Sequence, residues 1–167
     1  MNTASETADH LIELVGRRAQ AEASVQTGRS ELTRFANSFI HQNVGEDYVN
    51  VRLRVALDGR VAAVSGNHAS DEALAQLVDD ALIVAATQHV DPDWPGVTPK
   101  QELAATDFSS PSTIAATPGQ RADIVSDFVR AGGNYLAAGY CDTDWFDDDA
   151  AHRLIKFISV AWNAAHL

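Results

Sequence analysis

One alternating segment and the turn that follows it constrain the fold more than any other part of the sequence. From residue 49 to residue 57 every second side chain is apolar, which is the pattern of a strand with one buried face. Asp58-Gly59 comes next, and because both residues tolerate positive φ the pair predicts a tight hairpin turn. Residues 60–65 are then expected to return as the neighbouring strand. The apolar positions of the first strand are Val49, Val51, Leu53, Val55 and Leu57.

A helix with an apolar stripe is predicted directly after this hairpin. Ser70 is a suitable N-cap, and Asp71 and Glu72 lie in the first turn, where carboxylates interact favourably with the helix dipole. This helix is expected to lie across the apolar face of the strands. The chain is therefore predicted to have an α+β fold in which an antiparallel meander sheet is packed by amphipathic helices, in two layers. The stripe consists of Leu74, Leu77, Val78, Ala81, Leu82 and Ala85.

Shorter elements are predicted before the hairpin. An amphipathic helix with Ser5 as its N-cap is expected to end near Arg18. Asn37-Ser38 is expected to join two strands, because both side chains can satisfy local backbone groups. Glycine and polar residues suggest two further breaks. The predicted strands cover residues 21–27, 32–36 and 39–44, with turns at 28–30 and 45–47.

The remaining sequence begins with a long connection. Residues 87–117 lack periodicity and contain Pro92, Pro95, Pro99 and Pro111, so an extended segment is expected there. Thr117-Pro118 predicts a helix start and Gly132-Gly133 its end. A strand is expected over 135–140. Residues 143–167 are predicted to form a last helix with an acidic start, whose apolar stripe is Leu154, Ile155, Ile158 and Trp162.

Length and charge limit the classes of function. A chain of 167 residues is expected to fold as one compact domain. The formal net charge is -11, and residues 61–167 carry five basic against fifteen acidic side chains, so binding to a phosphate backbone is disfavoured. The only cysteine, Cys141, has no partner within the chain for a disulfide, and the N-terminus lacks a signal-peptide pattern, so a cytoplasmic location is expected. No apolar run approaches the length of a membrane span.

The sequence predicts no catalytic, cofactor-binding or metal residue. The six histidines are widely separated, and none stands in a His-Glu-x-x-His pattern. The acidic run that begins at Asp142 lacks the glycine and glutamate of a calcium loop, because Asp147 and Arg153 occupy those positions. Cys141 lies beside acidic residues that disfavour its thiolate, so a packing role is expected.

Several short motifs form one composite pattern along the chain. They extend from Gly28-Arg29 through the segment 34–42 and the Asp58-Gly59-Arg60 turn into the helix that begins at Asp71, and then through the proline-rich connection as far as Tyr140, and they cover about 120 to 130 residues. The residues that carry the pattern are Gly28, Arg29, Arg34, Phe35, Asn37, Ile40, Gln42, Asp58, Gly59 and Arg60. As a combination these motifs resemble the N-terminal domain of the TldD/PmbA family.

The resemblance implies a metallopeptidase family, also named modulators of DNA gyrase, whose members degrade or process peptides. It implies two related subunits that pair, of which one carries zinc. In the family the zinc motif lies in a C-terminal domain, and nothing in residues 1–167 matches it. Residues 1–142 are assigned to the N-terminal-like domain, and 143–167 depart from the family pattern.

Three interpretations remain open at this stage. The chain is an N-terminal domain that is inactive alone, a free-standing interaction or regulatory module that pairs with a full-length relative, or a truncated reading frame. The apolar stripe after residue 143 is expected either to dock on the domain or to mediate self-association.

Overall fold

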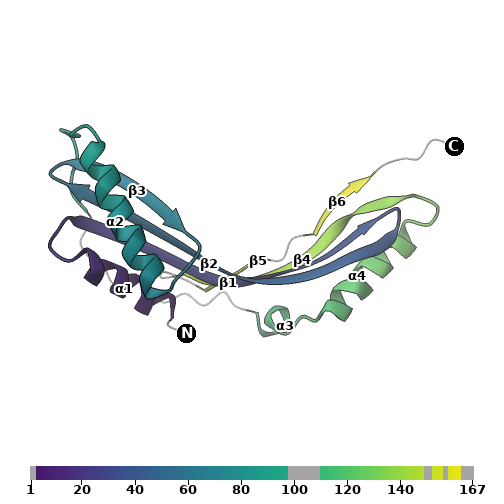
Figure 1. Cartoon of the computed structure of the whole chain (residues 1–167). Coiled ribbons are helices and arrows are strands. Elements are labelled where there is room, and N and C mark those ends of the chain that lie inside the picture. Colours follow the sequence, from purple (N-terminus) through teal and green to yellow (C-terminus); the bar gives the residue numbers. More distant parts are fainter. Residues whose placement is uncertain (1–2, 98–109, 149–151, 156–157, 163–167) are drawn as a thin grey trace. The chain divides into compact units, whose positions relative to one another are not determined.

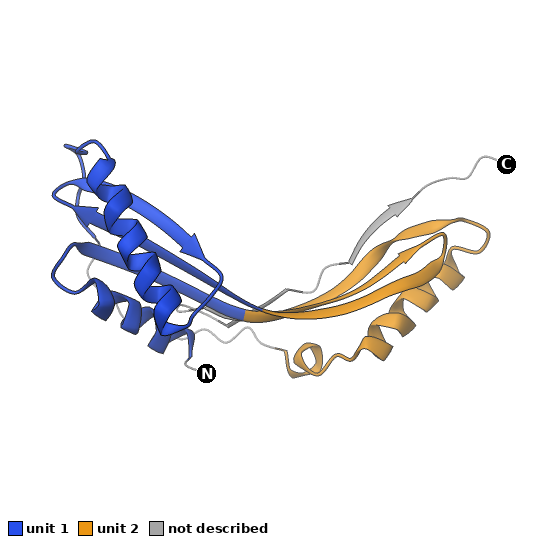
Figure 2. Cartoon of the chain, viewed as in Figure 1, with its two compact units in different colours: residues 1–27, 48–106, 147–151 blue, residues 28–47, 107–146, 152–167 orange. Residues whose placement is uncertain are grey.

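The computed structural model describes residues 3–97, 110–148, 152–155 and 158–162 (Figure 1). The chain divides into two compact units, coloured separately in Figure 2. The first holds residues 1–27, 48–106 and 147–151, and the second holds residues 28–47, 107–146 and 152–167. Each unit has its own apolar cluster, so the single core expected from the length is replaced by two.

The strands form one sheet with the order β3-β2-β1-β4-β5, and β6 also pairs with β4. Asn37 and Ser38 join β1 to β2, and Asp58-Gly59 joins β2 to β3, which makes the predicted antiparallel meander. Leu57 pairs with Arg60 and Val51 with Gly66. The bounds are β1 Gln20–Ala36, β2 Phe39–Leu57, β3 Arg60–Gly66, β4 Ala137–Asp148, β5 His152–Ile155 and β6 Ile158–Trp162.

Two helices pack on the sheet in the first unit and confirm the predicted α+β architecture. They are α1, Ala4–Val15, and α2, Asp71–Thr87. Val51, Leu53 and Val55 of β2 are buried against the predicted stripe of α2, because the alternation puts them on the face that the helix covers. The buried members of the two helices are Ala4, Ala8, Leu11, Val15, Leu74, Leu77, Val78, Ala81 and Ala85.

The caps of these helices confirm one prediction and correct another. Ser70 caps α2 as predicted, because its side chain accepts a hydrogen bond from the backbone N–H of Ala73. The N-cap of α1 is Thr3 and not Ser5. Thr3 and Glu6 form a capping box, in which each side chain bonds the backbone N–H of the other residue. Ser5 lies inside the first turn instead.

The second unit contains a short helix, α3 (Pro111–Ile114), and a longer one, α4 (Pro118–Ala131). Thr117 caps α4 in a capping box with Gln120, as the Thr117-Pro118 signal predicts. The core of this unit brings together Phe35, Val125, Ala137 and Cys141. The predicted connection over 87–117 therefore contains a helix, and its part from 98 to 109 lies outside the described residues.

The predicted turns at 28–30 and 45–47 are wrong, because β1 and β2 run through both segments without a break. The polar residues that suggested turns are instead cross-strand partners. Arg29 of β1 contacts Asp47 of β2 with 3.0 Å between Nη1 and Oδ1. Gly28 is buried within β1.

The predicted helix over 143–167 is also wrong where the structure describes this range, and residues 149–151, 156–157 and 163–167 lie outside the described residues. Residues 143–148 continue β4, and β5 and β6 follow. Ile158 pairs with Cys141 and Trp162 with Ala137, so backbone pairing with β4 replaces helical hydrogen bonds. Short apolar runs do not distinguish helix from strand by their period alone. The predicted domain boundary at 142 stays a prediction.

No helix in the described part of the chain is long and apolar enough to cross a membrane.

Replacing Leu77 by Ala tests the packing of α2. Leu77 is 9% exposed in the first core, so the substitution is expected to lower the free energy of unfolding by about 2 to 5 kcal/mol through lost burial and a cavity. Ile83→Ala is the matched control, because Ile83 lies on the same helix and is 64% exposed. The control should change stability by less than about 0.5 kcal/mol. Equal losses of stability for the two substitutions in urea titrations would contradict the packing of Leu77 in the first core.

Candidate functional site

The residues of the family resemblance are distributed along the sheet and do not form one pocket. Three of them make turns: φ is 52° at Asn37, 49° at Asp58 and 77° at Gly59. Phe35 is buried in the second core, and Ile40 packs against it. Arg34 and Gln42 are exposed on β1 and β2, and Arg60 begins β3. Gly28 and Arg29 lie side by side in β1.

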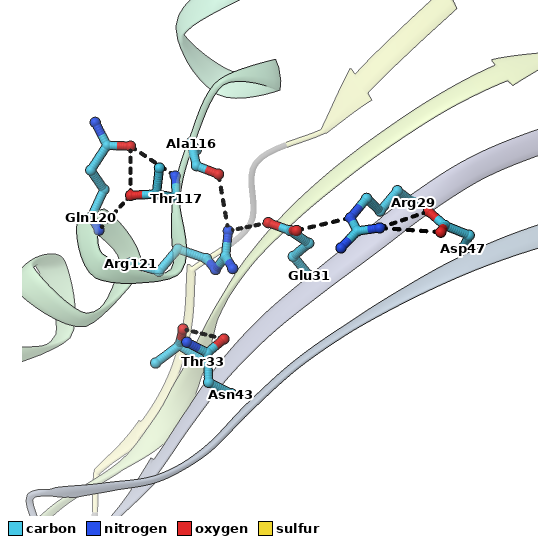
Figure 3. Close-up of polar contacts among 9 residues, drawn as sticks. All are labelled: Arg29, Glu31, Thr33, Asn43, Asp47, Ala116, Thr117, Gln120 and Arg121. Carbon is cyan, nitrogen blue, oxygen red and sulfur yellow. Dashed lines mark hydrogen bonds and ion pairs between the residues drawn. The ribbon is translucent and has the colours of Figure 1, made fainter.

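Four charged side chains form a connected chain among the described residues of the second unit. We call this chain the charge ladder, and its members are Asp47, Arg29, Glu31 and Arg121. Figure 3 shows that it runs from β2 across β1 to the first turn of α4. Nε of Arg29 lies 2.9 Å from Oε1 of Glu31, and Nη1 of Arg121 lies 2.6 Å from Oε2. Glu31 therefore accepts hydrogen bonds from two guanidinium groups, one with each carboxylate oxygen.

Arg121 is the buried member of the charge ladder. Its side chain is 2% exposed, and its Nη1 also donates to the carbonyl oxygen of Ala116 at 3.4 Å. The capping box at Thr117 fixes the start of α4 and so determines where Arg121 meets the sheet. A buried guanidinium is costly unless it is paired, so Glu31 compensates for its burial. Nε of Arg121 is buried without a hydrogen-bond partner.

Hydrogen bonds and charges within the charge ladder favour the charged forms of Glu31 and Arg29. The hydrogen bond from Arg29 is the largest cause that lowers the pKa of Glu31, and the hydrogen bond and charge of Arg121 lower it further. The hydrogen bonds to Glu31 and Asp47 raise the pKa of Arg29. A carboxylate stabilised in this way is a weak base. The charge ladder is therefore suited to joining β1, β2 and α4 rather than to moving protons.

Sequence reasoning found Arg29 through the family resemblance but missed Glu31, Asp47 and Arg121. Arg121 and Glu31 are 90 positions apart in the chain, and no local pattern connects them. Proximity of Arg121 to the Thr117-Pro118 signal was the only available hint, because it placed this arginine in the first turn of a helix.

A second polar group surrounds Trp94 in the first unit. The guanidinium carbon of Arg54 lies 5.6 Å from the centre of a Trp94 ring, within the range of a cation–π contact. The indole N–H of Trp94 donates to Gln20 at 3.4 Å, and Arg54 also pairs with Glu22. These contacts hold the segment after α2 against β1 and β2. They make it part of the first unit despite its lack of periodicity.

The donors needed for a zinc site do not converge in the described part of the chain. His10 lies on α1 with its Nε2 3.5 Å from Asp71, whereas His41, His68 and His89 are exposed on other segments. No group of three or more His, Cys, Asp or Glu side chains that could hold a metal occurs among these described residues. Cys141 is buried in the apolar core of the second unit. The zinc of the resembled family does not fit the donors described here.

Replacing Arg121 by Met tests the buried pair. The change should lower the free energy of unfolding by about 1.5 to 3 kcal/mol, because it removes a charged hydrogen bond from a mostly buried carboxylate. Arg130→Met is the matched control on α4, since the Arg130–Asp127 pair is exposed on both sides. The control is expected to cost less than about 1 kcal/mol. Chemical unfolding at pH 7 measures the stability of both variants. Equal losses of stability in the two variants would contradict a specific stabilising role of the Arg121–Glu31 pair.

The lowered pKa of Glu31 predicts acid sensitivity. The carboxyl group of Glu31 binds a proton less tightly in the folded chain than in the unfolded chain, where its pKa has the ordinary value of 4.5. The stability that Glu31 contributes is therefore complete above that value and is lost as the pH falls through the folded pKa. Glu31→Gln should lower stability at pH 7 and narrow the difference in melting temperature between pH 7 and pH 3. Glu46→Gln, at an exposed position of β2, should keep the wild-type difference.

Comparisons with known proteins give one matching family model and several structures of similar fold. The family model described as PmbA/TldA metallopeptidase domain 1 matches residues 21–85, from β1 through most of α2. No curated protein matches the sequence. The fold is similar to that of TldE from Thermococcus kodakarensis, with a TM-score of 0.68, 10% identity, and coverage of 95% of this chain and 40% of that one.

Two further structures share the fold. A candidate modulator of a DNA gyrase from Thermotoga maritima has a TM-score of 0.58 and 11% identity, with coverage of 93% of this chain and 37% of that one. A candidate modulator of DNA gyrase from Bacteroides thetaiotaomicron has a TM-score of 0.59 and 11% identity, with coverage of 93% and 38%. The chain thus spans well under half the length of these structures. Residues 21–85, which include most of β1, all of β2 and β3 and most of α2, thus match the first domain of the PmbA/TldA metallopeptidase family, and the chain has the fold that these three structures share.

Proposed function

We propose that this chain is the non-catalytic N-terminal domain of a TldD/PmbA-type metallopeptidase and serves peptide degradation or processing without itself holding zinc. The match of residues 21–85 to the first domain of the metallopeptidase family carries the proposal. The charge ladder supports it, because its charged groups are engaged with one another. The zinc of the family belongs to another domain in this proposal.

A second function is an interaction or regulatory module that pairs with a full-length family member. Exposed aromatic side chains favour this alternative: Phe39 is 71% exposed and Tyr135 is 62% exposed. Large apolar side chains that face solvent are common at sites where proteins associate. Pairing with a related subunit or with a second copy is part of both proposals. Light scattering of the chain with and without a zinc-bearing relative distinguishes a pairing module from a chain that stays alone.

The charge distribution supports a protein or peptide partner over a nucleic acid. Residues 61–167 carry ten more acidic than basic side chains, which repel phosphate. We also propose a cytoplasmic location, supported by the single, buried cysteine.

The proposal predicts that the purified chain binds no stoichiometric zinc and cleaves no unfolded peptide. The physical reason is that zinc needs three or four converging ligands to be held and to activate water. Metal analysis after dialysis and a digest of unfolded casein measure both properties. A zinc-bearing family member serves as the positive control. One tightly held zinc per chain together with cleavage that a chelator abolishes would contradict the proposal.

A further inference from the structure

The first half of β2 has an open backbone edge in the second unit. β3 pairs with β2 only from Val51 to Leu57, and β1 lies on the other side of β2. Among the described strands none pairs with the outer edge of residues 39–47, which also have exposed side chains except at Ile40. An unpaired strand edge presents N–H and C=O groups that can bind another extended chain. We call residues 39–47 the open edge.

An apolar cavity adjoins the start of the open edge. Its volume is about 340 Å³, and its walls include Phe39 and Ile40 from β2 and Val125, Ser126 and Val129 from α4. Phe39 is mostly exposed, whereas Val125 belongs to the second core. A strand added beside β2 would direct every second side chain toward the face that α4 covers. The cavity would receive one or two apolar side chains from such a strand.

The far end of the open edge is acidic. Glu46 is exposed, and Asp47 is already bound to Arg29. Seven residue steps separate Phe39 from Glu46, which corresponds to roughly 23 Å of extended strand. A basic side chain at that distance from the apolar anchor would face Glu46. The open edge therefore has backbone groups, an apolar cavity and a negative charge in a fixed order.

We propose that the open edge binds an extended peptide by β-strand addition, with an apolar side chain in the cavity beside α4 and a Lys or Arg side chain about seven residues away at Glu46. Backbone hydrogen bonds would supply affinity, and the two side-chain positions would supply selectivity. The inference rests on the proposed function only in taking peptides as the ligands of this family domain. It requires neither zinc nor cleavage, so the metal and digestion assays can fail or succeed independently of it.

The probe is a fluorescein-labelled nonapeptide of alternating Thr and Val with a Leu near one end and a Lys seven residues away, made in both chain directions. Fluorescence anisotropy with the full chain should show saturable binding of at least one direction. N-methylation of alternate backbone nitrogens is the first test, because it removes donors without changing the protein. One of the two N-methylated sets should weaken binding by about tenfold or more, since only one set of N–H groups faces β2.

Protein variants test the cavity and the charge. Ser126→Trp fills the cavity from an exposed position of α4 and should weaken binding by about tenfold or more. Asp123→Trp, at an exposed α4 position outside the cavity wall, is the matched control and should change binding by less than about threefold. Glu46→Lys should weaken binding of the Lys probe and restore binding of a probe that carries Glu instead.

Three results would overturn the proposal. The first is binding that survives both N-methylated sets and Ser126→Trp, which would place the peptide elsewhere. The second is no saturable binding of either direction while circular dichroism shows a folded chain. The third is a dimer in light scattering that Ser126→Trp breaks, which would make a second copy of the chain the occupant of the open edge.

Discussion

The chain reversal at Asn37-Ser38 decides which residues of β1 and β2 face each other, and both cores depend on that choice. Both residues have positive φ, and Ser38 is held by a 2.8 Å hydrogen bond from its N–H to the carbonyl of Ala137. Side chains alternate along a strand, so a slip of one residue would exchange the faces of β2. Val55 would then leave the first core, and Ile40 would leave the second. The turn thus supports two separate sets of apolar contacts.

The two units are stabilised in different ways. The first buries a long apolar face of the sheet under two helices, and most of its core side chains are aliphatic. The second has a smaller cluster around Phe35 and adds the buried Arg121–Glu31 pair to it. A buried ion pair is weak evidence for net stability, because desolvation opposes the attraction. Its specific contribution is positional, since only one placement of α4 brings Arg121 to Glu31.

Sequence patterns predicted the elements whose period and end signals agree. The alternation ending at Asp58-Gly59, the Ser70 cap and the Thr117-Pro118 signal all correspond to observed boundaries. Predictions failed where a short sequence segment was compatible with two kinds of local structure. Gly28 and Arg29 resemble a turn when read along the chain, but Arg29 finds Asp47 across the sheet. Most of the charge ladder was unpredictable for the same reason, because its partners are set by tertiary pairing. The helix predicted at the end of the sequence was wrong because a short apolar run can pair as a strand with β4 as readily as it can form a helix.

The burial of Cys141 makes its thiol a probe of local opening in the second unit. It is the only cysteine in the sequence, its side chain is 1% exposed, and it packs with Phe35, Val125 and Ala137. A thiol reagent in solution can modify it only after those neighbours separate. The rate of labelling therefore reports the opening of this unit alone, whereas the apolar cluster under α1 and α2 contributes no thiol to the signal. One residue thus allows the local stability of one half of the chain to be followed without a label being introduced.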